Sequence, residues 1–118
     1  MIVKKPTIVI YTCAADEQLL RQVCAGIEEE GVLYEIVTKP CGGAQGLSLL
    51  ACSASMLGVG IGMNGGAMAL HIKGMNVSRG SDEVTSLFEY DAPDAAAARR
   101  LGTNAARVIK KSPLCLPD

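Results

Sequence analysis

The sequence predicts one three-layer α/β domain over residues 1–118, in which a mostly parallel sheet lies between flanking helices. Two observations predict this fold class. Short apolar runs typical of buried strands alternate along the chain with apolar stripes of helical spacing. A chain of 118 residues also suits one compact domain, and neither an internal repeat nor a linker interrupts its pattern.

The first half of the chain predicts strand, helix, strand and helix in turn. Residues 7–11 form a short apolar run after a proline, and Asp16 can cap the helix that follows. The apolar stripe of that helix consists of Leu20, Val23, Cys24 and Ile27. Gly31 is expected to end it, because glycine is the usual residue just past a helix C-terminus. Residues 33–38 then predict a strand and residues 47–54 a second helix.

Residues 57–63 alternate between glycine and large apolar side chains, which predicts a strand with one bare face. The glycines satisfy G-x-G-x-x-G literally over residues 60–65, but a dinucleotide site needs a helix directly after them. Here Asn64-Gly65 is followed by a second alternating run, residues 68–72, so a β-hairpin is predicted instead. The bare face would let another backbone or a ring approach closely.

The last third predicts a strand at residues 84–90 and a final helix that Asp91 or Asp94 caps. Leu101, Ala105, Val108 and Ile109 form the apolar stripe of that helix. Lys110 and Lys111 lie in its last turn, where cations suit the helix dipole. Asp82-Glu83 and the pair Asp91 and Asp94 are better explained as loop and cap than as catalytic carboxylates.

The composition argues against two classes of partner. Nucleic-acid readers normally carry a basic field and stacking rings, whereas this chain has a net charge of −1, no tryptophan, three tyrosines and one phenylalanine. Residues 40–72 carry no Asp, Glu, Lys or Arg, but glycines and polar residues break up this stretch, so we expect no membrane span. A weakly charged surface near residues 42–46 or 64–66 is where a partner could dock.

The five cysteines are odd in number and lack C-x-x-C spacing, which argues against a disulfide framework and a zinc knuckle. Because residues 1–5 do not begin a signal peptide, we expect a cytoplasmic protein. Cys24 is expected in the core. Cys13 and Cys41, each just after a predicted strand, stay open as a thiol site. His71, the single histidine, is expected to be structural or solvent-facing.

Three consecutive carboxylates, Glu28, Glu29 and Glu30, end the first predicted helix just before Gly31. This position is electrostatically unfavourable, because a helix C-terminus is the negative end of the helix dipole. Helical geometry spreads the three side chains over roughly 200° of the surface, so at least one points away from the core. A solvated face is one reading. The other is recognition, in which a carboxylate meets a basic patch or completes a hard-cation site in another chain.

Five blocks of sequence resemble, in order and spacing, the small (beta) subunit family of the glycerol/diol dehydratase reactivating factor. They lie at residues 26–32, 59–62, 70–75, 101–110 and 112–113. The resemblance covers nearly the whole chain and is most specific in the last blocks. The medium subunit of the cobalamin-dependent dehydratase carries a similar core with extensions that this chain lacks, so the length favours the reactivase.

The resemblance implies a Rossmann-like fold similar to the dehydratase medium subunit and no active site in the chain itself. The small subunit pairs with a chaperone-like large subunit, which hydrolyses ATP and holds Mg²⁺ and ATP or ADP. The small subunit then leaves, and the large subunit captures the dehydratase medium subunit in its place. Damaged adenosylcobalamin is thereby released from the dehydratase. The expected location is the cytoplasm, with association with a bacterial microcompartment as a further expectation.

The resemblance also implies which residues matter. In the family, an acidic residue of the run reaches a metal site at the interface with the large subunit. Glu29 is the best match by position, with Glu28 and Glu30 as neighbouring interface residues. No catalytic or cofactor-binding residue is expected. The loops at 64–66 and 77–83 do not match the family residue by residue.

A stand-alone small-molecule domain remains the alternative. A flavodoxin-like or cobalamin-binding domain would use the loops at 12–15 and 40–46, which follow predicted parallel strands. The D-x-H-x-x-G motif of base-off cobalamin binders does not occur in the sequence. The residues leave open whether the client enzyme acts on glycerol or propane-1,2-diol.

Overall fold

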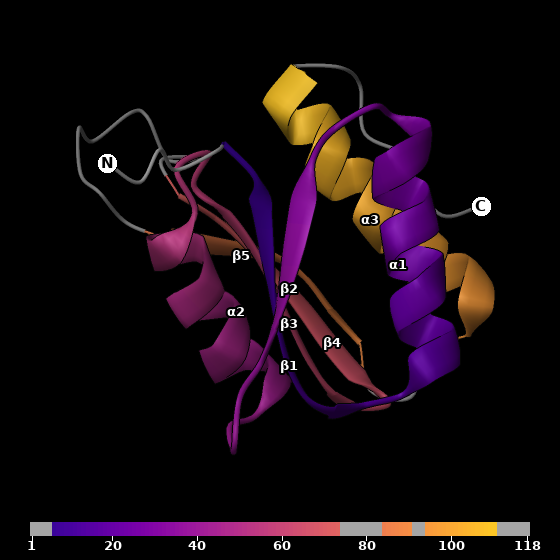
Figure 1. Cartoon of the computed structure of the whole chain (residues 1–118), viewed down its shortest axis with the longest axis vertical. Coiled ribbons are helices and arrows are strands. Elements are labelled where there is room, and N and C mark those ends of the chain that lie inside the picture. The colour runs from indigo at the N-terminus through magenta and orange to yellow at the C-terminus, as the bar shows by residue number, and fades with distance from the viewer. Residues whose placement is uncertain (1–5, 74–83, 91–93, 111–118) are drawn as a thin grey trace.

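The computed structural model describes residues 6–73, 84–90 and 94–110, and only the backbone of 84–90 (Figure 1). Strands and helices alternate in the predicted order. They are β1 (Ile8–Ala15), α1 (Glu17–Glu29), β2 (Tyr34–Thr38), α2 (Ala44–Ala54), β3 (Val59–Gly65), β4 (Ala67–Lys73), β5 (Val84–Tyr90) and α3 (Ala95–Lys110).

The described strands form one five-stranded sheet in the order β2-β1-β3-β4-β5. β1 pairs in parallel with β2 and β3, whereas β4 is antiparallel to both β3 and β5. Four strands therefore point the same way, and β4 alone runs against them. The predicted α/β class is confirmed, and the strand directions are mostly parallel, although the two pairings that β4 makes, with β3 and with β5, are antiparallel.

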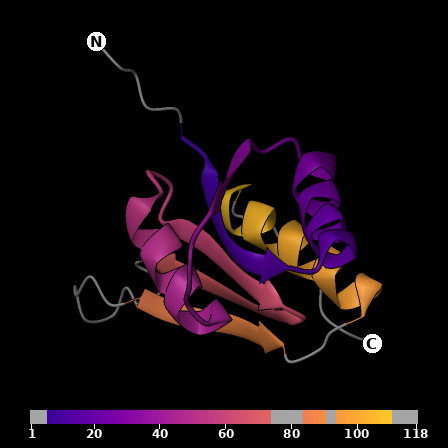
Figure 2. The same cartoon turned by 60° about the horizontal axis from the view of Figure 1, so that its bottom comes forward.

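Helices lie on both faces of the sheet, with α2 on one side and α1 and α3 together on the other (Figure 2). The bare face of β3 lies against α2. A Cβ added to Gly60 would collide with the backbone of Cys52, and one added to Gly62 would collide with the backbone of Ala44. The predicted close approach of another backbone is therefore confirmed, and that backbone is a helix of the same chain.

The main core lies between the other face of the sheet and the pair α1 and α3. The predicted strand residues Val59, Ile61 and Met63 are all buried there. The stripe of α1 is confirmed with one change, because Leu19 takes a buried position and Leu20 is only partly buried. In the stripe of α3, Leu101 and Ala105 are buried, and Val108 and Ile109 pack against the core from partly buried positions.

The ends of the elements follow the predicted local chemistry. Asp16 Oδ1 accepts hydrogen bonds from the backbone N–H groups of Gln18 (2.9 Å) and Leu19 (3.1 Å), which caps α1. Gly31 has a φ of 76° just past that helix, as a glycine stop requires.

Asp94 caps α3, because its Oδ1 accepts from Ala97 N at 2.8 Å. The alternative cap Asp91 lies outside the described residues, as do Asp82-Glu83, Lys111 and Cys115. β1 extends past the predicted end at residue 11, through an irregularity at Ala14, whose φ is 50°.

Candidate functional site

The three carboxylates of the acidic run lie where α1 ends. Glu28 and Glu29 belong to the last turn of the helix, and Glu30 is its C-cap. The last turn of α1 contains no basic residue. The negative charges therefore do face the negative end of the helix dipole, as the sequence indicates.

Cations of α3 offset this arrangement within the chain. Arg99 binds Glu29 through both Nε and a terminal guanidinium nitrogen, each 2.7 Å from Glu29 Oε1. Arg107 Nε lies 3.4 Å from Glu30 Oε2, and Lys110 Nζ lies 3.2 Å from Glu30 Oε1. Lys110 also donates to the backbone oxygen of Glu30 at 3.1 Å, so it serves the C-terminus of α1 as well as its own helix.

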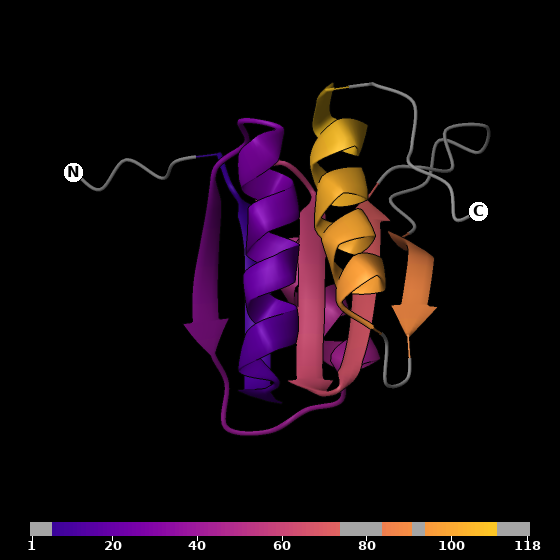
Figure 3. The same cartoon turned by 90° about the vertical axis from the view of Figure 1, so that its right-hand side faces the viewer.

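Two glycines bring the helices close enough for these contacts. A Cβ added to Gly26 would collide with the backbone oxygen of Arg99, and one added to Gly102 would collide with the backbone oxygen of Val23. α1 and α3 run side by side in the same direction, so their C-termini lie at the same end of the molecule (Figure 3). The cations of α3 consequently reach the acidic end of α1.

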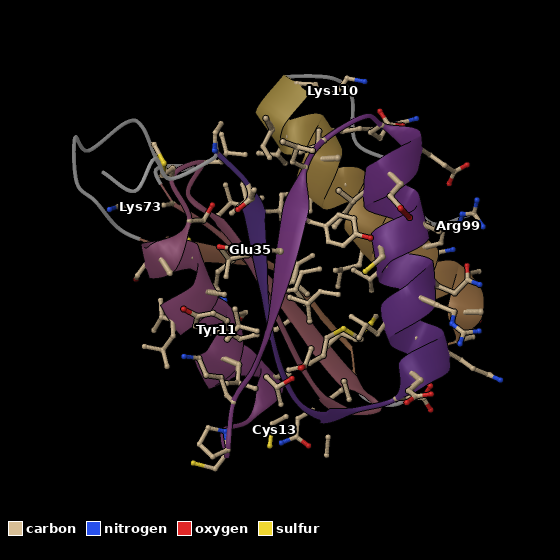
Figure 4. All side chains as sticks on the ribbon, in the orientation of Figure 1. Tyr11, Cys13, Glu35, Lys73, Arg99 and Lys110 are labelled. Carbon is tan, nitrogen blue, oxygen red and sulfur yellow. The ribbon has the colours of Figure 1, made fainter. Side chains whose placement is uncertain are left out.

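The environments of the carboxylates differ. The Glu29 side chain is 55% exposed, whereas the Glu30 side chain is 17% exposed and contacts two cations. The hydrogen bond from Arg99 lowers the pKa of Glu29, and the hydrogen bond from Lys110, with the nearby charges of Lys110 and Arg107, lowers the pKa of Glu30. Both are therefore ionised at neutral pH. Figure 4 shows Arg99 and Lys110 beside α1, with Lys110 at its C-terminal end.

Glu28 takes a different place, on the rim of a hollow between α1 and β2. The hollow has a volume of about 450 Å³ and is lined by Glu17, Leu20, Arg21, Cys24, Glu28, Tyr34 and Ile36. Desolvation, together with the neighbouring Cys24 and Glu28, raises the pKa of Tyr34 to about 12. Burial also raises the pKa of Cys24, which is 8% exposed and lies in the core as predicted.

Cys13 and Cys41 are the thiol site that the sequence leaves open. Cys13 is half-buried and Cys41 is exposed, and both are free thiols. Within residues 6–73, 84–90 and 94–110, no three His, Cys, Asp or Glu side chains come together as a metal site would need. Cys13 and Cys41 stay open as a thiol pair.

His71 is buried on β4 and forms a hydrogen bond with Ser48 Oγ of α2. This confirms the structural reading of the histidine. The two loops with weak charge do lie together, because Asn64 Nδ2 donates to Gly42 O at 2.7 Å. None of the described helices is long and apolar enough to cross a membrane.

The sequence reasoning missed the role of α3 at this site. The sequence patterns predict no role for Arg99 or Arg107, and they predict only that Lys110 interacts with the dipole of the helix to which it belongs. The sequence does contain a signal for this contact. The first predicted helix ends in three acids and the last carries cations, and each helix contains one glycine, Gly26 and Gly102 respectively, at which a neighbouring helix could approach closely. What the sequence lacked was evidence that the two helices are neighbours.

Comparison with known proteins places these features in a family. Residues 5–115 match the model of the family described as dehydratase medium subunit. The propanediol dehydratase-reactivating factor small subunit of Citrobacter freundii is 33% identical over 108 residues, which cover 92% of this chain and 89% of that protein.

Two solved structures are similar to nearly the whole chain. A structure of diol dehydratase-reactivating factor complexed with ADP and Mg²⁺ matches with a TM-score of 0.80 and 31% identity, over 95% of this chain and 99% of the other. A glycerol dehydratase reactivase structure matches with a TM-score of 0.80 and 26% identity, over 95% and 98% of the respective chains.

Proposed function

The chain belongs to the dehydratase medium subunit family, and from this premise we propose that it is the non-catalytic small subunit of a factor that reactivates a glycerol or diol dehydratase. The observation that carries the proposal is similarity, in sequence and in fold, over almost the full length of reactivating factor small subunits. The functional unit would be one domain over residues 1–118 in the cytoplasm, associated with a bacterial microcompartment where the dehydratase is.

The partner in this proposal is a large subunit that hydrolyses ATP and holds Mg²⁺ and ADP or ATP. The chain occupies the large subunit until an inactivated dehydratase arrives, and the dehydratase medium subunit then takes its place. Damaged cobalamin leaves the dehydratase as a result. Membership of the family described as dehydratase medium subunit supports this exchange, because two chains of one fold can present similar surfaces to one partner.

Glu29 is the residue that we assign to a metal ion at the interface with the large subunit. Both contacts of Arg99 fall on Glu29 Oε1, so Oε2 can bind a cation without first displacing the guanidinium. Magnesium prefers oxygen ligands in an octahedral shell, of which one carboxylate supplies only a part. The remaining ligands would come from the large subunit, its nucleotide and water.

The neighbouring carboxylates suit this role less well. Glu30 is mostly buried and holds two cations of α3, so its charge serves the packing of α1 against α3. The Glu29–Arg99 pair is about half-exposed on both sides, and such surface pairs are screened and easily remodelled. Glu28 belongs to the same helical turn but forms no ion pair with a described cation, which makes it the matched control for Glu29.

The test is the affinity of the chain for the large subunit, measured with Mg²⁺ and ADP and again with EDTA. Glu29→Gln is expected to weaken the complex in Mg²⁺ at least about tenfold and to change little in EDTA, while Glu28→Gln behaves as wild type. Equal affinities of wild type and Glu29→Gln in Mg²⁺ would refute the metal role alone. A wild-type chain that forms no complex would refute the proposed function.

Exchange is tested separately with a fluorescently labelled chain in a preformed complex. Inactivated dehydratase added with ATP is expected to release the labelled chain in step with the return of dehydratase activity. Return of activity while the label stays in the complex would contradict the placeholder role.

A further inference from the structure

Among the described strands, β2 is an edge strand with no neighbour along its outer side, and all of its residues except Tyr34 are exposed. It lies at the end of the sheet beside β1 (Figure 3). Leu33 is 58% exposed just before the strand, and Ile36 and Val37 are 44% and 36% exposed within it. A free edge with apolar side chains is a template for pairing with another strand, and proteins normally protect such edges.

The hydrogen bonds of β2 fix which groups face outward. Ile8 N donates to Leu33 O at 3.0 Å, and Lys39 N donates to Thr12 O at 2.7 Å. In a parallel ladder alternate residues bond the same neighbour, so the odd-numbered residues of β2 face β1. The N–H and C=O groups of Tyr34, Ile36 and Thr38 therefore point away from the sheet.

The side chains of β2 sort into two faces, because successive residues alternate. Leu33, Glu35, Val37 and Lys39 share one face, with Tyr34 and Ile36 on the face toward α1, where they line the hollow. Figure 4 shows Glu35 on the side of β2 away from α1. Glu35 and Val37 are exposed and Lys39 is half-buried over the ring of Tyr11.

This order of charges is complementary to itself. When two copies of β2 pair antiparallel with their two-fold axis at Val37, Ile36 of each copy exchanges main-chain hydrogen bonds with Thr38 of the other. Glu35 of each copy then lies directly opposite Lys39 of the other, and Val37 faces Val37 between the two charge pairs. Cross-strand pairs of opposite charge and of β-branched residues are the favourable ones.

The neighbouring registers are poorer. A shift that places the axis at Glu35 sets two carboxylates opposite each other, which is destabilising. An axis at Ile36 places Glu35 opposite Val37 and Lys39 opposite Leu33, so neither charge has an opposite partner directly across. Of these registers, only the one centred on Val37 sets both charges opposite partners of opposite sign while Ile36 and Thr38 of each copy keep their main-chain hydrogen bonds.

We propose that the free chain associates with a second copy of itself through antiparallel pairing of β2, centred on Val37 and held in register by Glu35–Lys39 pairs across the axis. The two sheets join into one continuous sheet with two-fold symmetry. This inference stands on the geometry of β2 and does not depend on the large subunit proposed above. The contact is small, so the dimer is expected to dissociate on dilution.

A charge-swap cycle tests the pairing by sedimentation equilibrium of the full chain over a range of concentrations. The wild-type mass is expected to rise with concentration toward twice the 12.3 kDa of one chain. Glu35→Lys and Lys39→Glu each place like charges opposite each other twice, so each should weaken association about tenfold or more. The double variant Glu35→Lys/Lys39→Glu restores opposite charges and should associate like wild type.

Leu50→Lys is the control, because Leu50 is 59% exposed and belongs to α2 and not to the pairing strand β2. It should associate like wild type. The proposal is overturned if wild type stays at 12.3 kDa at all concentrations, if either single charge variant associates as wild type does, or if the double variant stays monomeric. Recovery in the double variant also shows that the charge changes leave the fold intact.

Discussion

Replacing glycine by alanine is expected to have opposite effects on stability at Gly60 of β3 and at Gly46 of α2, because only Gly60 lies against the backbone of a neighbouring element. At Gly60 an added Cβ would overlap backbone atoms of Ala51 and Cys52. Backbone cannot rotate away as a side chain can, so α2 must lift from the sheet and loosen the buried contacts beneath it. Overpacking a core costs about 1–3 kcal/mol, and we expect Gly60→Ala at the upper end, about 3 kcal/mol.

Gly46, in the first turn of α2, is the matched control. It is exposed, and an added Cβ would meet no atom within 4 Å. Gly46→Ala should therefore stabilise the protein by about 0.5 kcal/mol, because alanine restricts the unfolded chain more than glycine does. The same methyl group is thus expected to act with opposite sign in the strand and in the helix it packs against.

Urea unfolding followed by circular dichroism, at one fixed protein concentration, measures both effects. The midpoint should fall clearly for Gly60→Ala and rise slightly for Gly46→Ala, with the slope m unchanged. A Gly60→Ala variant with the wild-type midpoint would refute the close contact between β3 and α2. A loss of stability in Gly46→Ala would refute the assignment of residue 46 to an exposed helical turn.

Three further predictions concern single groups. Asp16→Ala removes the cap of α1 and should cost about 1 kcal/mol, read from the urea midpoint, with no loss contradicting the cap. The contacts with Lys110 and Arg107 lower the pKa of Glu30 below its ordinary value of 4.5. The stability that the Glu30 carboxylate contributes is therefore fully present above pH 4.5 and is lost as the pH falls through the lowered pKa. Glu30→Gln should consequently lower the midpoint at pH 7 and weaken its fall toward acid pH. In an alkaline absorbance titration one tyrosine should ionise near pH 12, and Tyr34→Phe should remove that step.

Local chemistry made much of the fold predictable. The cap at Asp16, the stop at Gly31 and the β3–β4 hairpin each depend on residues close in sequence, and each is confirmed. The turn of the hairpin lies one residue later than the Asn64-Gly65 signal, because Asn64 still pairs with Ala67 and leaves Gly65-Gly66 as the turn. The bare face of β3 likewise followed from the alternation of glycine with large side chains. Helical periodicity predicted the apolar stripe of α1 correctly except at its first residue, because Leu19 and not Leu20 takes the buried position there.

Long-range pairing was not predictable from the same patterns. Glu29 and Arg99 are 70 residues apart, and they meet because β1 and β5 point the same way and place their helices on one face. From the sequence alone the acidic run suits either a solvated face or recognition by another chain, but Arg99, Arg107 and Lys110 offset its charge inside the chain. Its unfavourable position is therefore not by itself evidence of a partner, and the assignment of Glu29 to a metal stays a proposal.

The most direct test of the account is to mix the tagged chain with the large subunit of a dehydratase-reactivating factor and Mg²⁺·ADP, and to titrate the same chain with cobalamin. A reactivase small subunit is expected to form a complex of defined stoichiometry that survives size-exclusion chromatography, and to leave the cobalamin spectrum unchanged. A chain that binds cobalamin and leaves the large subunit alone would contradict the account and favour a stand-alone ligand-binding domain.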